Sequence, residues 1–242
     1  MKKLVCLLLL FSVTVVFFSC RDDSGEFEEQ LFTTAQITFA LKQCADSTMF
    51  RTCNALCVVD TVKHELGYTY YDAESYRIAL PANTKKVLDT LIQHGYEGQI
   101  DTLVLKMNKA AEKCGNKITQ FWRGIIPNLN FPNPKLLLHE SDSAITNYVK
   151  ATKQTEFISK LASSTLLEQF EALEIISTWN LFQEKYFEIT SQFVSIDILT
   201  PASQQMANGF FRKMIIEEKK IREKPEFRGE KEGWLYKVFA TL

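Results

Sequence analysis

The sequence contains few of the residues that interrupt helices, with 9 glycines and 6 prolines among 242 residues. It also lacks long runs in which apolar and polar residues alternate, which is the pattern of a half-buried strand. Hydrophobic residues make up 46% of the chain, enough to form one good core. The sequence therefore predicts an all-α fold, with a single domain of about eight helices over residues 34–242. A small β-hairpin near residues 64–80, where "YTYY" and "YRIAL" favour strands, is the one exception we consider.

Motifs of several common enzyme classes are also missing. The chain has no glycine-rich phosphate loop, no Gly-x-Ser-x-Gly elbow, no His-Glu-x-x-His helix and no Cys-x-x-Cys pair. Its 3 histidines leave little room for a histidine-based triad. Lysine and arginine number 28 against 29 aspartates and glutamates, so the net charge of -1 gives no basic footprint for nucleic acid. We expect neither a nucleic-acid partner nor a cofactor.

An uncharged apolar run occupies the N-terminus. Lys2 and Lys3 precede the run from Leu4 to Phe18, which is shorter than the roughly 20 apolar residues that span a bilayer. A basic start followed by such a run is typical of a secretory signal peptide, which we assign to residues 1–19. The alternative is a buried N-terminal helix, but the run has no polar residues at helical period.

The run ends in "FFSC", which resembles the lipobox of bacterial lipoproteins. The resemblance implies that Cys20 is lipidated, palmitate being a typical acyl chain, and becomes the first residue of the mature protein. It also implies a place in the cell envelope, anchored to the outer membrane on its periplasmic or its surface face. Two or more acyl chains, at about 0.8 kcal/mol per buried methylene, make such anchoring stable. Residues 20–33 are then the lipidated cysteine and an acidic tether. Cleavage by ordinary signal peptidase, which would release a soluble periplasmic protein, is the alternative.

Helical periodicity and capping residues predict the elements of the domain. They are a first helix capped by Thr33 or Thr34 and ending near Gly67, a short helix over 83–94, an apolar stripe over 100–125, a helix starting at Ser141 or Asp142, two or three helices over 155–189, a long helix capped by Thr200, and a last helix from Pro225.

Several stretches of the chain carry a resemblance to one family. They are "MNKAAEKC" at 107–114, "DSAITNYV" at 142–149, and "NGFFRKMIIEEKKIREKPEFR" at 208–228 followed by "LYKVF". In this order they are similar to the bacterial envelope family called domain of unknown function 4197, over about residues 34–240. The resemblance implies a secreted, helical protein of unknown activity. The first helix of that family normally lacks the cysteines seen here.

A carboxylate interrupts the apolar face of the predicted long C-terminal helix, at Glu217 or Glu218. Glu218 and Arg222 are four residues apart, the spacing at which opposite charges meet on a helix. A desolvated glutamate there could act as an acid or base. Alternatively, Glu218, Arg222 and Arg228 form a partly buried bridge that fixes the C-terminal helices, and we favour this interpretation.

Asn108 and Glu112 form a second pair four residues apart, beside the apolar stripe. They either line a site or make a surface or helix-packing hydrogen bond, and we favour the second interpretation. The neighbouring small residues Ala110 and Ala111 suit a close approach of two helices.

Cysteines are concentrated in the predicted first helix. Cys53, Cys57, Asp60 and His64 follow one another at steps of four, three and four, and zinc or copper accepts such ligands. One straight helix cannot surround an ion, so a metal would need only some of these residues and an outside ligand such as Cys44 or Cys114. Disulfides or free core thiols are the alternatives, and we favour these over a metal.

These observations lead to three hypotheses of function. The first is an envelope-anchored lipoprotein that acts as a non-enzymatic binding or structural module, with an envelope protein, a peptide or a lipid as its ligand. The second is an enzyme that uses Glu218 or Glu112 as acid or base. The third is a carrier of an apolar ligand, with which the 18 phenylalanines are compatible.

Overall fold

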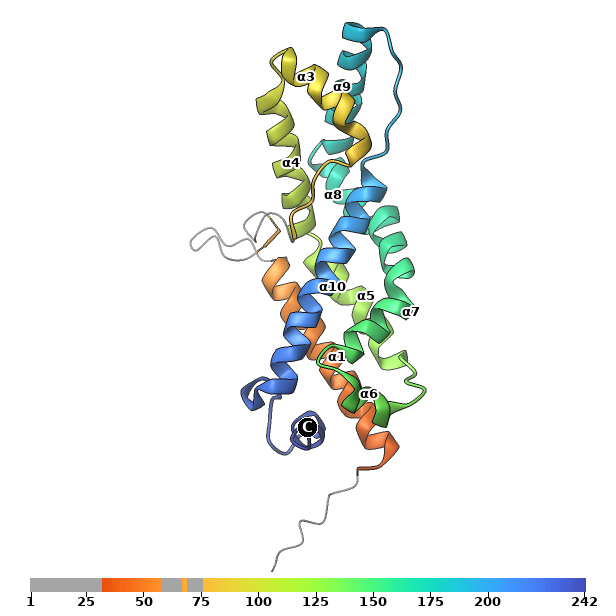
Figure 1. Ribbon diagram of the computed structural model, residues 1–242, viewed down its shortest axis with the longest axis vertical. Helices are drawn as coiled ribbons and strands as arrows, with labels where there is room; N and C mark the ends of the chain where they lie inside the picture. Colours follow the sequence, from red (N-terminus) through yellow and green to blue (C-terminus); the bar gives the residue numbers. More distant parts are fainter. Residues whose placement is uncertain (1–31, 58–66, 69–75) are drawn as a thin grey trace, which may run out of the picture. The chain divides into compact units, whose positions relative to one another are not determined.

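The computed structural model describes residues 32–57, 67–68 and 76–242, and most of these residues are helical (Figure 1). Because α7 (Ala144–Lys160), a π-helical segment (Leu161–Thr165) and α8 (Leu166–Ala172) form one continuous run, the described residues carry nine separate α-helices and no strand. The prediction of an all-α domain is confirmed. The predicted signal peptide, Cys20 and most of the tether lie outside the described residues, as does most of the segment in which we considered a hairpin.

The remaining elements follow in chain order. They are α1 (Thr34–Leu56), α3 (Lys85–Gln93), α4 (Glu97–Glu112), α5 (Gly115–Ile125), α6 (Pro134–Glu140), α9 (Ile175–Thr190), α10 (Leu199–Glu223) and α11 (Trp234–Phe239), with short 3-10 turns at Ala82–Thr84, Ile126–Asn128 and Pro225–Phe227. Within the described ranges, none of these helices has both the length and the apolar composition needed to cross a bilayer.

The helices pack in two groups that α10 connects. In one group α1 contacts α5, α6, α10 and α11. In the other, α3, α4, α8 and α9 lie together at the upper end of Figure 1. The long helix α10 contacts α1 and α7 and also reaches α8, so its side chains meet both groups.

Aromatic side chains from three helices fill the centre of the core. Trp122 on α5 stacks parallel to Phe210 on α10, with ring centroids 6.2 Å apart. Phe157 on α7 lies 5.3 Å from the Phe210 ring and 6.0 Å from that of Phe211. All four side chains are buried. Because each removes a large apolar area from water, this cluster determines how α5, α7 and α10 meet.

The first helix is shorter than predicted. It begins after Thr33, which caps it as expected, but it ends at Leu56, with Cys57 as the C-cap. The backbone N–H of Gly67 donates to the Ala55 carbonyl at 2.7 Å, and a continuing helix would need that carbonyl for its own ladder. The prediction of one helix reaching to Gly67 is therefore wrong.

The apolar stripe over 100–125 covers two helices and not one. α4 ends at Glu112 and α5 starts at Gly115. A Cβ atom at Gly115 would lie 2.7 Å from the Cβ of Cys57, so the start of α5 sits directly against the end of α1. That close approach needs a residue without a side chain, and the chain turns immediately before it.

Other helix starts also differ from the prediction. The sequence reading missed α6, although Asn133 caps it through its side chain and Pro134 is its first residue. α10 starts at Leu199, where the Asp197 carboxylate accepts the N–H groups of Leu199 and Thr200 at 2.8 and 3.3 Å. Asp197 is therefore the capping side chain that we had assigned to Thr200. α7 starts at Ala144, slightly later than expected, and Pro225 opens a 3-10 turn that is separate from α11.

Candidate functional site

Glu218 is a fully buried carboxylate at the start of another helix. From α10 its Oε1 accepts the N–H of Ile145 at 3.1 Å, and its Oε2 accepts the N–H of Thr146 at 2.7 Å. Both N–H groups belong to the first turn of α7, which has no intrahelical acceptor for them. The carboxylate thus caps α7 from outside and meets the positive end of its dipole.

Arg222 joins this carboxylate to the end of α6. Its Nε donates to Glu218 Oε1 at 2.9 Å. Its two terminal nitrogens donate to the carbonyls of Leu138 and Leu137 at 2.7 and 3.3 Å, in the last turn of α6. The guanidinium also lies 5.4 Å from the centre of the Phe239 ring on α11. Arg222 therefore connects α10 with α6 and α11 directly, and with α7 through Glu218.

Arg228 binds the backbone carbonyls at the C-terminal end of α10. Its Nε donates to the carbonyl of Ile221 at 2.9 Å, and its Nη2 donates to that of Arg222. Both carbonyls lie in the last turn of α10. Burial lowers the pKa of the Arg228 guanidinium. The structure thus brings Glu218, Arg222 and Arg228 together in one network, in which the bonds go to helix ends.

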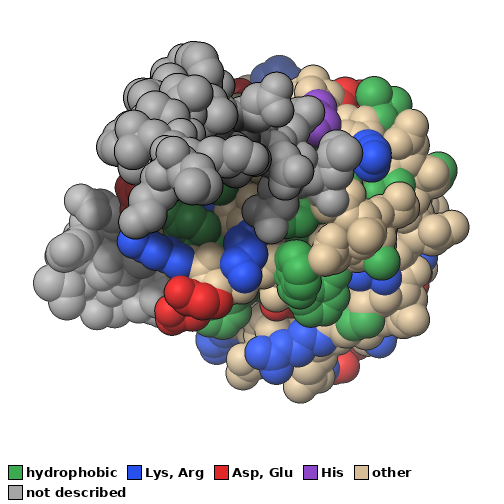
Figure 2. All heavy atoms as spheres, turned by 90° about the horizontal axis from the view of Figure 1, so that it is seen from below, with side chains coloured by type: hydrophobic (Ala, Val, Ile, Leu, Met, Phe, Trp, Pro, Cys, Tyr) green, Lys and Arg blue, Asp and Glu red, His purple; other side chains and the backbone are tan. Residues whose placement is uncertain are grey.

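A cavity of about 560 Å³ lies beside this network, lined among others by Arg222, Arg228 and Leu242. Figure 2 looks onto the end of the molecule that carries α6 and α11, where lysine, arginine, acidic and apolar side chains are interspersed. His139 and Asp142 also line the cavity. Its charges are of both signs, and its two arginines already bond to backbone carbonyls.

Glu217 belongs to a different arrangement from its neighbour Glu218. Its Oε1 lies 2.8 Å from the Nζ of Lys213 and 2.8 Å from that of Lys220. Burial acts to raise the pKa of the Glu217 carboxyl, but the two ammonium groups outweigh it and hold this pKa below its usual value.

Asn108 binds backbone and does not extend the charged network. Its side-chain amide donates to the carbonyl of Ile78 and accepts the N–H of the same residue, both at 2.8 Å. Gln205 on α10 makes the same pair of hydrogen bonds to Ala79: its side chain accepts the N–H at 2.9 Å and donates to the carbonyl at 3.0 Å. Two carboxamides from different helices thus hold the irregular segment that leads into α3.

Glu112 lines a pocket of about 560 Å³ between α1 and α5. Cys53 and Cys57 line the same pocket. The structure therefore places the buried Glu112 with two of the cysteines that the sequence singled out. Asn108, four residues earlier, instead faces the segment before α3.

Four cysteines lie within the described ranges, and all four are free thiols. Cys44, Cys53 and Cys114 are buried, and Cys57 is half-buried. Burial raises the pKa of Cys114 to about 12 and that of Cys44 further. In this part of the chain no three histidines, cysteines or acidic residues are arranged to hold a metal ion. Asp60 and His64 lie outside it, so the metal hypothesis stays untested for the full set.

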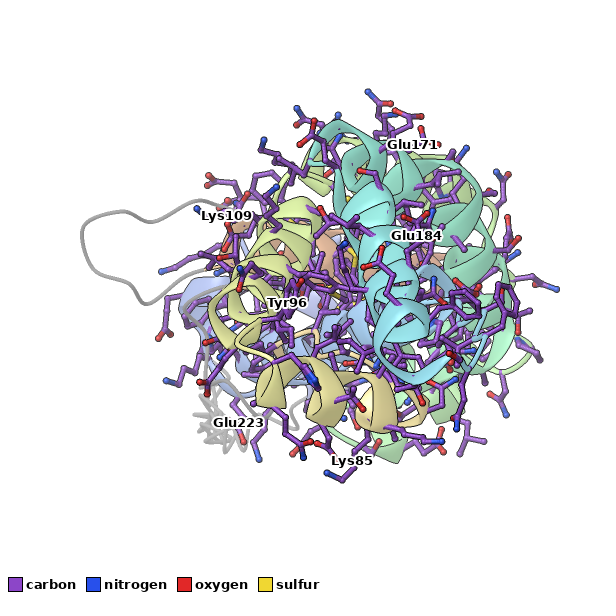
Figure 3. All side chains as sticks on the ribbon, turned by 90° about the horizontal axis from the view of Figure 1, so that it is seen from above. Lys85, Tyr96, Lys109, Glu171, Glu184 and Glu223 are labelled. Carbon is purple, nitrogen blue, oxygen red and sulfur yellow. The ribbon has the colours of Figure 1, made fainter. Side chains whose placement is uncertain are left out.

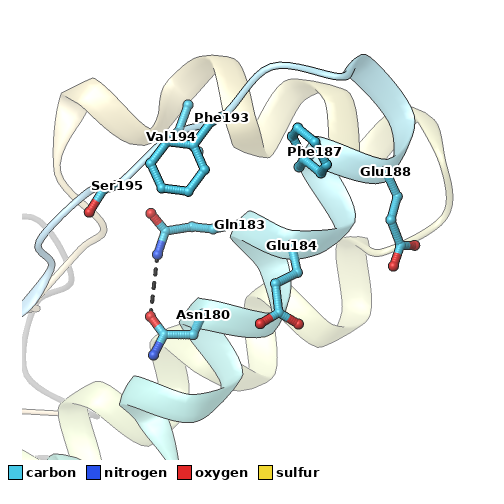
Figure 4. A pocket seen from close by; sticks show the side chains of 8 residues that line it. All are labelled: Asn180, Gln183, Glu184, Phe187, Glu188, Phe193, Val194 and Ser195. Carbon is cyan, nitrogen blue, oxygen red and sulfur yellow. Dashed lines mark hydrogen bonds between the residues drawn. The ribbon is translucent and has the colours of Figure 1, made fainter.

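A surface pocket of about 570 Å³ on α9 was not predicted (Figure 4). The rings of Phe187 and Phe193 border it, 49% and 80% exposed respectively. Glu184 and Glu188 extend from the same side of α9. Figure 3 looks down on this end of the molecule, with Glu184 on α9 and Tyr96 at the start of α4.

Hydrogen bonds at both ends fix the loop that carries Phe193. At its start the Gln192 side chain accepts from Lys86 Nζ at 2.7 Å and from the Tyr186 hydroxyl at 3.2 Å. At its end the N–H of Ile196 donates to Gln183 Oε1 at 2.7 Å. Trp179 donates its Nε1–H to the carbonyl of the same Ile196, also at 2.7 Å. An exposed aromatic ring is therefore presented on a restrained backbone.

The sequence alone offered little indication of this pocket. Phe187 and Phe193 lie among other apolar residues, and exposure cannot be read from residue type. Ser191, which has φ of 54°, ends α9 immediately before the loop. A left-handed serine is uncommon, so its turn is not predictable from composition.

Comparison with known proteins places the chain in a family. A family model described as "Protein of unknown function (DUF4197)" matches residues 40–240. No curated protein and no solved structure matches the chain.

Proposed function

Because the chain belongs to the DUF4197 family, for which no activity is known, we propose a function from its own geometry. The protein is a non-enzymatic helical binding module, tethered to the cell envelope through lipidated Cys20. It captures a peptide segment of another envelope protein at the α9 pocket. The observation that carries the proposal is Phe193, whose ring is 80% exposed on a loop fixed at both ends.

Rigid aromatic side chains suit protein recognition. They bring a large contact area, and a preformed loop loses little conformational entropy on binding. Aromatic residues near the centre of an interface frequently supply most of its binding free energy. Phe193 and Phe187 face one opening, so an apolar side chain of the partner can pack against both rings.

The charges beside the pocket indicate the kind of peptide. Glu184 and Glu188 are exposed next to the rings, and Glu188 also pairs with Lys185 at 2.7 Å. Carboxylates at the rim favour a segment with lysine or arginine beside its apolar residue. The same carboxylates oppose contact with an anionic lipid surface, so we favour a peptide over a lipid.

The acid–base alternative has less support. The Glu218 carboxylate accepts two backbone N–H groups and one guanidinium N–H, so both of its oxygens already accept hydrogen bonds from the protein. A general acid or base must instead reach a substrate proton. The carrier alternative has less support as well, because Trp122 and Phe157 fill the core by direct packing.

The test is capture of the partner from native membranes. The protein is cross-linked in membranes, purified, and its cross-linked peptides are identified by mass spectrometry. We expect Phe187→Ser with Phe193→Ser to reduce the recovered partner by about tenfold or more, since central aromatic contacts contribute about 2 kcal/mol. The control is Phe39→Ser, which changes a ring 51% exposed on α1. Equal recovery by both variants, with cross-links elsewhere on the domain, would reject the α9 pocket as the binding surface.

A further inference from the structure

The pocket between α1 and α5 brings a pair of thiols to one wall. Cys53 and Cys57 are one helical turn apart, joined by a 2.8 Å bond from the N–H of Cys57 to the carbonyl of Cys53. Both line the pocket of about 560 Å³. A space of this size accepts a small molecule, and of the two thiols that line it Cys57 is half-buried and Cys53 is buried.

The thiols of the pair interact directly. A hydrogen bond with Cys57 lowers the pKa of the Cys53 thiol; burial acts in the opposite direction, and a hydrogen bond with Thr119 lowers it further. The Cys53 thiol also lies 3.8 Å from the Met49 sulfur, to which its S–H can donate. The pKa of Cys57 is raised, first because its proton is held in that bond and then by burial. The pair thus releases one proton more readily than an isolated thiol and the second with difficulty.

Cys44 and Cys114 have no comparable lowering of their pKa. The Cys114 thiol donates to the carbonyls of Ala110 and Thr165 at 3.2 and 3.5 Å, and burial raises its pKa to about 12. Cys44 is fully buried, and its pKa is raised by burial too. Reactivity of a cysteine follows the thiolate and its access, so both features favour the pocket pair.

The walls of the pocket also carry charge. Lys113 and Arg123 line it and bring two positive charges, against one negative charge from Glu112. A carboxylate on the ligand can therefore be paired inside the same pocket that presents the thiols. A positively charged ligand of the same size meets one opposite charge, on Glu112, and two like charges.

We propose that Cys53 is a thiolation site, which forms a mixed disulfide with a small disulfide bearing a carboxylate. The Cys53 thiolate attacks one sulfur of the ligand, a new sulfur–sulfur bond forms and the ligand's own bond breaks. The leaving thiolate takes a proton from water. Cys53 sulfur is oxidised and one ligand sulfur is reduced, so the small disulfide is the oxidant. The site is separate from the α9 pocket and does not depend on peptide capture.

The ligand stays attached in this proposal. A disulfide between Cys53 and Cys57 would have to form along one turn of helix, where the hydrogen bond between their backbones fixes the spacing. Cys57 is therefore a donor that stabilises the thiolate, and its sulfur does not displace the ligand.

The experiment compares two probes of similar length and opposite charge, dithiodipropionate and cystamine. Each is mixed with the folded protein, the reaction is stopped with acid, and the adduct is located by peptide mass spectrometry. We expect one adduct per chain, on Cys53, formed about tenfold faster with dithiodipropionate than with cystamine, in line with a single ion pair of modest strength. Arg123→Gln should reduce this preference.

Substitutions identify the attacking sulfur. Cys53→Ser should abolish the adduct, Thr119→Val should slow its formation, and Cys114→Ser, the matched control, should leave it unchanged. If Cys53→Ser does not fold, the proposal is still tested by two rates of adduct formation: the rate in Thr119→Val, and the rate with each of the two probes. Equal labelling of Cys44, Cys114 and the pair would overturn the proposal. So would an adduct that remains in Cys53→Ser, an equal rate for both probes, or an internal disulfide with no ligand retained.

Discussion

Glu217 and Glu218 are neighbours in the sequence, yet they meet different partners. Glu218 meets the N-terminal turn of α7 and one arginine, whereas Glu217 lies between two lysines. Consecutive residues of a helix point about 100° apart, so the two carboxylates face different parts of the core. A buried carboxylate with such partners stabilises the fold only while it is ionised.

The pKa of Glu217 therefore predicts a dependence of stability on pH. Because this pKa is lowered in the folded protein, the ionised carboxylate stabilises the fold above its ordinary pKa of 4.5, and that contribution is lost as the pH falls through the folded value. We expect Glu217→Gln to lower the free energy of unfolding by about 2 kcal/mol at pH 7 and by much less near pH 3, measured by denaturant titration.

The matched control is Glu188→Gln, which removes a glutamate from an exposed pair with Lys185. That change should cost less than about 1 kcal/mol at either pH. A loss for Glu217→Gln that is the same at both pH values would contradict the role we give to its charge.

Residue spacing predicted one of the contacts of Glu218 and Arg222 but not the others. The four-residue step between Glu218 and Arg222 predicted their ion pair, which the structure confirms at 2.9 Å. It could not predict that Glu218 caps α7 or that Arg222 binds the end of α6. Those partners lie 72 to 85 residues away in the chain, and nothing local in the sequence encodes which helix end arrives there.

At the scale of elements, the start of α1 was predictable from its local cap, whereas the equally local caps of α6 and α10 were missed or assigned to another residue. Thr33 caps α1 through its neighbour Gln36, and its pattern is visible in the sequence. The end of α1 was not predictable, because it depends on Gly67 returning to the Ala55 carbonyl. The division between α4 and α5 depends likewise on the contact of Gly115 with Cys57.

The segment before α3 is an element without regular structure that side chains hold in place. Asn108→Ala removes the two bonds to Ile78 and leaves its buried N–H without that acceptor. Leaving such a group unsatisfied costs about 1–3 kcal/mol. We expect the amide of Ile78 to exchange with deuterium at least about tenfold faster, measured by hydrogen exchange and mass spectrometry.

A surface asparagine provides the comparison. Asn147→Ala removes an exposed bond to the Ser143 hydroxyl on α7, and it should leave exchange at Ile78 unchanged. If exchange at Ile78 is equally slow in Asn108→Ala, the segment is held by its packing and not by the carboxamide.

At the scale of the whole molecule, composition predicted the fold class but no activity. Scarce glycine and proline, with apolar residues at helical spacing, were enough for an all-α domain. The α9 pocket was beyond prediction, because its walls come from a helix and a loop that are joined by side-chain hydrogen bonds of Gln183, Trp179 and Tyr186. The thiol pocket likewise needs α1 and α5 to come together.

The proposed anchor is a property of the whole chain. We expect wild-type protein to sediment with membranes and to carry acyl chains on Cys20, because two or more chains give stable anchoring. Cys20→Ala should appear in the soluble fraction, measured by fractionation and mass spectrometry of the N-terminal peptide. Cys6→Ala, a cysteine within the predicted signal peptide, should not change the distribution. Cys20→Ala protein that remains in membranes would reject the anchor.

The network of Glu218, Arg222 and Arg228 has a consequence for the order in which the chain can fold. The first turn of α7 and the last turn of α6 receive their partners from residues synthesised 72 to 85 positions later. In addition, the N–H of Leu235 on α11 donates to the side chain of Gln43 on α1, which lies 192 positions earlier in the chain. An emerging chain cannot complete these bonds until its C-terminal helices exist. Such a chain stays incompletely folded throughout synthesis, a state that suits passage across a membrane before folding.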